Sequence, residues 1–309
     1  MTLKIRDDRQ MRALTGLPEE KINELEKVFT EVYEEEKQKA YEKAVAEGTR
    51  QRKPGGGRKG SLPTMWDKLI FVLYYLKVYP TFDVLGTQFG LYRSKACENV
   101  HNLLPILQLA LVRLGVTPQR KFNSVAELRK TCAGLDKILI DVTERAHHRP
   151  QDNAKQEEMY SGKKNKHTVK NTIISTVEKV ILFVGQTFTG HNHDYSMLKE
   201  EFPPEYPWFE HIIALLDLGY QGAQTDYEGG QIEIPHKKPR KSKSNPNPEL
   251  TAEQKAENRA LSKVRIFVEN AIGGIKRFGI LVQVFRNRRK KFDDDVIALT
   301  AGLWNFLLA

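Results

Sequence analysis

The spacing of apolar residues changes near residue 137, and this change limits the folds open to the chain. From Pro18 to about Gly48, apolar residues recur every three or four positions, the period of an amphipathic helix. After residue 137 come runs rich in β-branched residues, namely KILIDVT, KNTIISTV, VILFVGQTFT, HIIALLD and IEIPH. Helices are expected over 251–278 and 294–308. This order predicts an α/β domain with a mixed five-stranded sheet flanked by helices, preceded by an all-α region.

Three helices are expected between residues 64 and 111. The first begins near Thr64 and ends before Pro80. The second is FDVLGTQF, capped by Thr81, and the third is KACENVHNLL, capped by Ser94. This is the outline of a helix-turn-helix, a DNA-binding module; the alternative is a plain three-helix bundle that packs on the second domain. The exposed polar side chains that DNA binding would use are Arg93, Lys95 and Asn99.

The chain divides into four segments by these patterns. Residues 1–48 form an N-terminal helical segment whose apolar stripe needs a partner, either the rest of the chain or a second copy, so dimerisation is one interpretation. Residues 49–63, TRQRKPGGGRKGSLP, form a basic Gly-rich linker that can lie along phosphates. Residues 64–129 form the helix-turn-helix domain, and residues 130–309 form the α/β domain.

The charge of the chain is strongly basic outside its first segment. Lys and Arg number 49 against 39 Asp and Glu, a net charge of +10. Residues 1–48 hold nine basic and twelve acidic side chains, a net of −3, so the remainder carries +13. Such a surface attracts polyanions, of which nucleic acid is the commonest, although basic surfaces also serve solubility.

Cysteine usage and apolar content favour a cytoplasmic protein. Cys97 and Cys132 match no zinc or redox spacing and are expected to be buried, reduced thiols. The N-terminus lacks the apolar core of a signal peptide, and no apolar run reaches the roughly 18 residues of a membrane span.

Two carboxylates follow apolar strand runs, where an unpaired charge is costly to bury. Asp141 follows KILI, and Asp217 follows IIALL. Either residue alone is commonly a strand cap or the start of a turn. As a pair on neighbouring strands, they favour a site for a hard cation, which prefers oxygen ligands.

A third carboxylate, Glu269, lies in the mostly apolar helical run KVRIFVENAIGGIKRFG. Arg265 is four residues before it and Lys276 seven after, so the three share one helical face. A solvated face with one ion pair is the ordinary interpretation. The alternative is a metal–phosphate site in which the carboxylate holds a metal and the cations hold a phosphodiester.

The motifs ILID-VTE, YSGKKNKHTVK, GHNHDYSML, LLDLGYQG and Arg265-x3-Glu269-x6-Lys276 occur in an order that resembles the DDE transposases of bacterial insertion sequences. The chain is most similar to the group named after insertion sequence five, whose catalytic domain is similar to that of Harbinger elements. The resemblance covers roughly residues 64–308. One departure is Ser262, where related families often carry a Tyr three residues before the Arg.

The resemblance implies a ribonuclease-H-like fold in which Asp141, Asp217 and Glu269 form the catalytic, metal-binding triad. It implies two Mg²⁺ ions, with Mn²⁺ as a substitute, that bracket a scissile phosphate. The substrates would be double-stranded DNA with terminal inverted repeats and target DNA, bound by a homodimer or higher homo-oligomer at the nucleoid. The remaining DNA-contacting candidates are Lys163, Lys166, His167, Arg265, Lys276, Arg286, Arg288 and Arg289.

Two other functions remain open at the level of sequence. One is a DNA-binding or regulatory protein descended from a transposase, without catalysis. The other is a ribonuclease-H-like nuclease that cuts structured nucleic acid without strand transfer. His191, His193 and Asp194 also have a zinc-ligand spacing, but alternating residues at a strand edge are more commonly structural.

Overall fold

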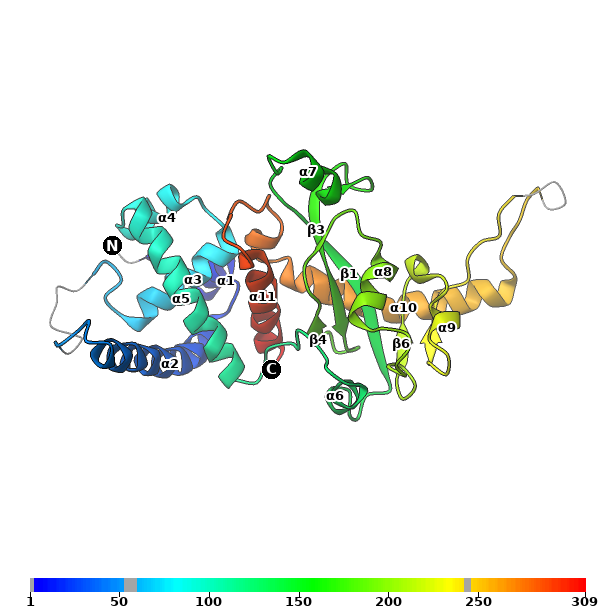
Figure 1. Ribbon diagram of the computed structural model, residues 1–309, viewed down its shortest axis with the longest axis horizontal. Coiled ribbons are helices and arrows are strands. Elements are labelled where there is room, and N and C mark those ends of the chain that lie inside the picture. Colours follow the sequence, from blue (N-terminus) through cyan, green and yellow to red (C-terminus); the bar gives the residue numbers. More distant parts are fainter. Residues whose placement is uncertain (1–2, 53–59, 242–245) are drawn as a thin grey trace. The chain divides into compact units, whose positions relative to one another are not determined.

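The computed structural model describes residues 3–52, 60–241 and 246–309 (Figure 1). The chain forms two compact units. The first unit comprises Met1–Thr117, Arg277–Gln283 and Asn305–Ala309, and the second comprises Pro118–Lys276 and Val284–Trp304. The chain therefore passes between units near residue 117, twelve positions before the expected boundary at 129. Most of the expected linker, residues 53–59, lies outside the described residues, and Leu62 at its end is buried.

The first unit begins with α1 (Asp8–Thr15) and the long helix α2 (Glu19–Ala46). The apolar stripe of α2 is buried, and the helix packs against α3 (Met65–Val78) and α5 (Arg93–Arg113). Arg113 donates two hydrogen bonds to Glu35, joining the end of α5 to α2. The stripe therefore finds its partner within the chain, and dimerisation through α2 stays a prediction that would have to use its charged faces.

Three helices of the first unit confirm the expected helix-turn-helix order. Thr64 and Asp67 form a capping box that starts α3, which ends at Tyr79 in a left-handed conformation just before Pro80. The Thr81 hydroxyl caps α4 (Phe82–Phe89), and Gly90 ends it.

The third of these helices differs from expectation at its start. The prediction that Ser94 caps it is wrong, because α5 begins at Arg93 with Tyr92 as its cap, and no side chain bonds the exposed amides there. The helix also continues through Pro105 to Arg113, so it is about twice as long as the predicted segment. Leu103, Leu104 and Leu107 continue its buried face, and that packing offsets the backbone hydrogen bond that proline cannot donate.

The second unit contains a mixed sheet. Its central order is β2-β3-β1-β6-β7, with β4 and β5 paired to β3. β1 runs antiparallel to β3 and parallel to β6, which confirms the predicted mixed sheet. The strands are β1 (Lys137–Ala146), β2 (Tyr160–Ser161), β3 (Lys166–Ser175), β4 (Ile181–Val184), β5 (Phe188–Thr189), β6 (Ile213–Leu215) and β7 (Ile232–Glu233).

The described residues thus form seven strands, two more than predicted. The additional β2 has two residues, and the run 180–189 is divided into β4 and β5 by residues 185–187. Such short strands form only because a partner strand is present, so they are hard to predict from the local sequence.

Helices cover both faces of the sheet. The helices of the second unit are α6 (Val125–Thr131), α7 (Asn153–Met159), α8 (Asp194–Glu201), α9 (Ala223–Asp226), α10 (Ala252–Ile275) and most of α11 (Phe292–Leu308), with short 3₁₀ turns η1 (Leu218–Tyr220) and, in the first unit, η2 (Gly279–Leu281). α8 packs on one face, and α10 contacts β1 and β3 and runs behind the sheet in Figure 1.

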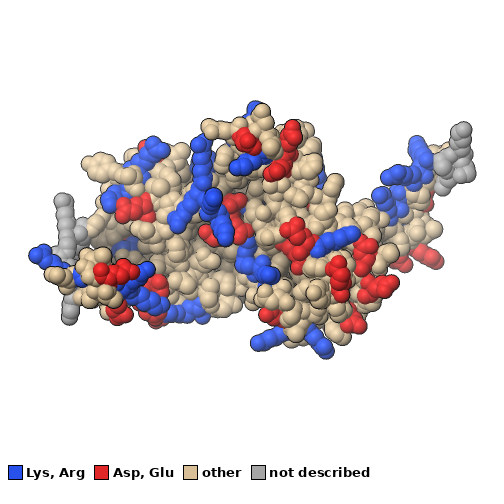
Figure 2. Space-filling view, viewed as in Figure 1, with Lys and Arg blue, Asp and Glu red and all other residues tan. Residues whose placement is uncertain are grey.

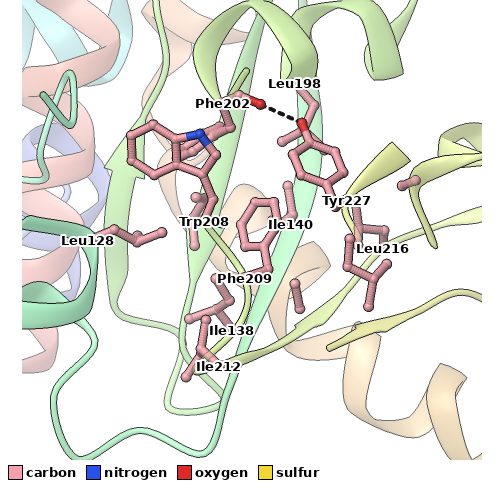
Figure 3. Close-up of a cluster of buried hydrophobic side chains, with 14 of the residues drawn as sticks. Leu128, Ile138, Ile140, Leu198, Phe202, Trp208, Phe209, Ile212, Leu216 and Tyr227 are labelled. Atoms are coloured by element: carbon pink, nitrogen blue, oxygen red, sulfur yellow. Dashed lines mark hydrogen bonds between the residues drawn. The ribbon is translucent and has the colours of Figure 1, made fainter. Parts of the chain in front are cut away.

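The core on the α8 face fixes the orientation of the central strands. Ile138 and Ile140 from β1 pack there with Phe202, Trp208 and Phe209 (Figure 3). Tyr227 belongs to the same cluster and donates a hydrogen bond to the Phe202 carbonyl at 2.6 Å. Because side chains alternate along a strand, Leu139 and Asp141 lie on the opposite face, toward α10.

A basic arm leads into α10. Its described residues Lys237–Lys241 are exposed, and Figure 2 shows Lys and Arg side chains gathered along this arm. Among the described residues, no helix combines the length and the apolar composition needed to cross a membrane.

Candidate active site

Asp141 lies in β1, and Asp217 lies two residues after the end of β6, the parallel neighbour of β1. The pairing of β1 with β6 places Leu139 opposite Leu215, where the ladder ends. Two residues further along each chain segment, Asp217 lies close enough to Asp141 for its charge to raise the pKa of the Asp141 carboxyl. The two strands are neighbours, as expected, but Asp217 lies beyond the end of β6, and the assignment of the two carboxylates to a metal site stays a prediction. Asp141 does not end its strand as expected, because β1 continues to Ala146 through its pairing with β3.

The environment of Asp141 disfavours its charged form. Burial raises the pKa of its carboxyl to about 6, and the nearby charge of Asp217 adds to the rise. The Val142 amide, which donates to Asp141 Oδ1 at 2.7 Å, and the Arg265 charge only partly oppose it. A half-buried carboxylate beside a second one is a group whose charge a cation would stabilise.

Tyr220 places a buried hydroxyl beside these carboxylates. Asp217 caps η1 by accepting from the Gly219 amide at 2.6 Å, and this turn carries Tyr220 into the core at 1% exposure. Burial, followed by the charges of Asp141, Asp194 and Asp217, raises the Tyr220 pKa well above its usual value. Its hydroxyl has no hydrogen-bond partner among the described residues. No pattern in the sequence indicated a role for Tyr220, although it follows Asp217 by three positions.

Two cations, Arg265 of α10 and Lys276 directly after this helix, lie near Asp141. Arg265 lowers the pKa of the Asp141 carboxyl, and its Nε is buried without a partner among the described residues. Burial lowers the pKa of Lys276, while Asp141 and Glu144 act in the opposite direction. The structure therefore brings both predicted cations to the first carboxylate.

Glu269 lies on the same face of α10 but is exposed. Within the described parts of the chain, no group of three His, Cys, Asp or Glu side chains is arranged to hold a metal ion. Asp141 and Asp217 supply the oxygen donors that a hard divalent cation prefers, and the partnerless Arg265 Nε is available to an anion. The residues present fit a metal–phosphate site, with Glu269 as a third ligand only by prediction.

The motif around residue 163 forms a turn between β2 and β3. Lys163 and Lys166 are exposed there, and His167 packs edge-on against Tyr160 with ring centroids 5.9 Å apart. Asp194 at the start of α8 pairs with Lys170 of β3, Oδ1 to Nζ at 2.9 Å. Asp194 therefore already has a cationic partner.

The helix-turn-helix candidates are exposed and make only surface contacts. The Arg93 side chain is 74% exposed and pairs with Asp83 at 3.7 Å, and Lys95 pairs with Glu98 at 2.7 Å. Asn99 donates to the Lys95 carbonyl. Because exposed ion pairs contribute little free energy, these side chains can exchange partners for phosphates or base edges.

Another basic surface precedes α11 and consists of Arg286, Arg288 and Arg289. These side chains are exposed and suited to phosphate contact.

Comparison with known proteins gives this arrangement a family. Residues 140–305 match the family of DDE superfamily endonucleases, and residues 60–112 match the helix-turn-helix of DDE superfamily endonuclease. The chain is 30% identical over 270 residues, covering 86% of this chain and 88% of the relative, to a probable transposase for insertion sequence element IS702 of Microchaete diplosiphon. No solved structure matches the chain. The predicted assignment to the group of insertion sequence five stays a prediction. The chain belongs to the DDE superfamily endonucleases and carries the family's helix-turn-helix module ahead of its endonuclease domain.

Proposed function

We propose that the protein is a DNA transposase that binds terminal inverted repeats and cuts and joins DNA strands. The observation that carries this proposal is that Asp141 and Asp217 lie close together next to the parallel β1–β6 pairing, in a chain that resembles an insertion-sequence transposase along most of its length. The helix-turn-helix would bind the repeats, the α10 side of the sheet would act on the strand, and the site of action would be the nucleoid.

The catalytic residues of the proposal are Asp141, Asp217 and Glu269, which would hold divalent metal ions. DDE superfamily endonucleases generally use such ions, and we propose two Mg²⁺, replaceable by Mn²⁺. When bound, they supply the Lewis-acid chemistry that activates an attacking oxygen and stabilises a leaving one. Glu269 is exposed in the structure, so its side chain would have to turn toward the two aspartates when metal and DNA bind.

Arg265 and Lys276 would orient the DNA backbone. The buried Arg265 Nε lacks a partner among the described residues and can donate to a phosphate oxygen. Lys276 is partly buried beside Asp141 and Glu144, so it can balance the negative charge that a phosphodiester brings. Tyr220, with its unpartnered hydroxyl, would donate to one of the neighbouring carboxylates and hold its orientation.

The reaction needs no covalent bond to the protein. Water would attack the phosphorus at the element end and release a 3′-hydroxyl, which would then attack a phosphodiester of target DNA in the same site. Bringing two ends together suggests a homodimer or higher homo-oligomer on DNA.

A test is cleavage and joining of labelled DNA that carries the repeat flanking the native locus, in Mg²⁺. We expect cutting and transfer by the wild type and neither by Asp217→Asn. Asp136→Asn is the matched control, because Asp136 is exposed just before β1.

A second candidate function is a DNA-binding or regulatory protein without catalysis. The observation behind it is that Glu269 is exposed and that, among the described residues, no three metal-ligating side chains are arranged around a metal position. Repeat-specific binding without cutting in any divalent metal would favour this function. Cutting of structured DNA without transfer would instead indicate a nuclease.

A further inference from the structure

Two cavities lie in the second unit, and the first of them is beside the carboxylate pair. The first, of about 370 Å³, is lined by Lys163, Lys170, Asp194 and Gly219 among others. Gly219 also donates its amide proton to Asp217, so this cavity opens beside the proposed catalytic residues. The second, of about 520 Å³, is lined by Arg149, Glu157 and His167 among others.

The two cavities share Tyr160, Gly162 and His191. Their volumes fall in the range of small-molecule sites, roughly 300–1,000 Å³, so each is suited to one or two nucleotides rather than to a duplex. A strand leaving the carboxylate pair along the first cavity would meet the second one at these shared residues.

Tyr160 supplies an aromatic surface at the junction. Its side chain is large and apolar yet 44% exposed. His167 packs edge-on against the ring at an interplanar angle of 72°, which supports the ring, and the exposed part of the Tyr160 side chain is accessible to another aromatic group. An exposed aromatic residue at the junction of two cavities is an arrangement on which unpaired bases stack.

The charges of the lining favour a polyanion, but weakly. Asp194 is paired with Lys170, and the second cavity has one basic and one acidic lining residue, Arg149 and Glu157. Among the described lining residues, Lys163 is then the cation without an opposing carboxylate, with His167, His191 and His193 beside it. Such a site would gain more from base stacking than from phosphate contacts.

We infer that these two cavities bind unpaired nucleotides of the DNA strand next to the scissile phosphate, with one base stacked on Tyr160. This inference rests on the proposed function, because it gives that function's active site a single-stranded neighbour. Under this inference the two cavities bind the single-stranded end of the DNA, whereas the helix-turn-helix binds the duplex.

The test is the dissociation constant of the full chain for a fluorescein-labelled ten-nucleotide oligo(dT), measured by anisotropy in EDTA at fixed salt. Tyr160→Ala should weaken binding about 5- to 100-fold, the range for loss of one stacked base. Tyr160→Phe should bind within about twofold of wild type, because the stacking ring is kept. Tyr206→Ala is the control, since Tyr206 is 57% exposed in the same unit and lines neither cavity.

Two further variants examine the cavity and its charge. A Cβ at Gly162 would meet nothing within 4 Å, so Gly162→Val should fold normally and weaken binding by filling the cavity. Lys163→Ala should reduce the salt dependence, with the slope of log K against log[salt] smaller by about 0.7. Thermal unfolding of each variant checks that the fold is kept.

The outcomes separate this inference from the proposed function. If Tyr160→Ala and Gly162→Val are both folded and bind oligo(dT) as the wild type does, the inference is overturned, whether or not the wild type cuts repeat DNA. If the wild type never cuts but oligo(dT) binding depends on Tyr160, the site stands and the catalytic proposal fails.

Discussion

The helix-turn-helix and the sheet unit place their candidate DNA-contacting groups by different means. Arg93, Lys95 and Asn99 lie within seven residues of one helix, and all three make only contacts at the surface. Asp141 and Asp217 are 76 positions apart in the sequence and become neighbours only through the pairing of β1 with β6. The first surface has little buried charge, whereas the second holds a carboxylate whose pKa is raised to about 6. DNA binding by the helix-turn-helix depends on exposed side chains of one helix, whereas strand cleavage would depend on buried groups brought together by strand pairing. A substitution can therefore change one of these two activities without changing the other.

The largest expected effect is on DNA cleavage, and it comes from a substitution of Glu269 that should leave DNA binding unchanged. Glu269→Gln should lower DNA cleavage about 10³-fold, the several kcal/mol that a metal ion contributes to such a reaction. Affinity for repeat duplex should stay within about twofold. Glu253→Gln, an exposed change near the start of the same helix, is the control for both assays. If the two variants cleave DNA at equal rates, Glu269 has no role in catalysis.

The second effect concerns the buried charge of the sheet unit. The raised Asp141 pKa means that its contribution to stability is full below about pH 4 and is lost as pH rises through about 6. Without metal, we expect this group to reduce the free energy of unfolding by about 2 to 3 kcal/mol between pH 4 and pH 7. Asp141→Asn should flatten that part of the profile in urea unfolding with EDTA.

Glu201 provides the control for this pH profile. Burial raises its pKa to about 7, so the free energy of unfolding also falls with rising pH because of this group. Glu201→Gln should remove only its own share and leave the fall between pH 4 and pH 6. A profile that Asp141→Asn does not change would mean that Asp141 is better solvated than the structure indicates.

Two adjacent glycines of α10 measure how closely that helix packs within the sheet unit. A Cβ at Gly274 would lie 2.6 Å from the Trp304 ring, whereas one at Gly273 would meet nothing within 4 Å. Gly274→Ala should destabilise by about 1 to 3 kcal/mol through overpacking. Gly273→Ala should stabilise by about 0.5 to 1 kcal/mol, because alanine is the better helix former. Thermal unfolding of the two variants measures these changes. Equal changes in stability would contradict the close packing of Gly274 against Trp304.

The smallest effect examines local capping in the helix-turn-helix. Thr64→Ala removes a capping box from α3 and should cost about 0.5 to 2 kcal/mol. Ser94→Ala should change stability by under about 0.5 kcal/mol, because the residue is exposed inside the first turn of α5 and caps nothing. Urea unfolding of both variants makes the comparison. A larger loss for Ser94→Ala would restore the cap expected from the sequence.

Local sequence signals predicted the helix-turn-helix well, except at Tyr92. The caps at Thr64 and Thr81 and the stop at Gly90 each act within a few residues, so a short window contains their cause. The start of α5 has no capping side chain and its length depends on buried leucines. There the packing of the unit, and not a local signal, sets the helix.

The candidate site was predictable only in part. Apolar runs ending in Asp141 and Asp217 indicated buried carboxylates, because unpaired charge in a strand is costly. The roles of Tyr220 and Tyr160 left no comparable signal, since a tyrosine in a turn or at a helix end is unremarkable by itself. Their positions beside the carboxylates and between the two cavities come from elements distant in the chain.

The sequence by itself determined the element types, the mixed sheet, the basic character and the family motifs, because these depend on composition and on spacing within short windows. Only the tertiary structure decided that α2 buries its apolar stripe against α3 and α5. It also decided that Arg265 and Lys276 lie near Asp141 while Glu269 is exposed. The physical reason is that burial and electrostatic coupling depend on distances between residues far apart in the sequence, which strand register and helix packing set.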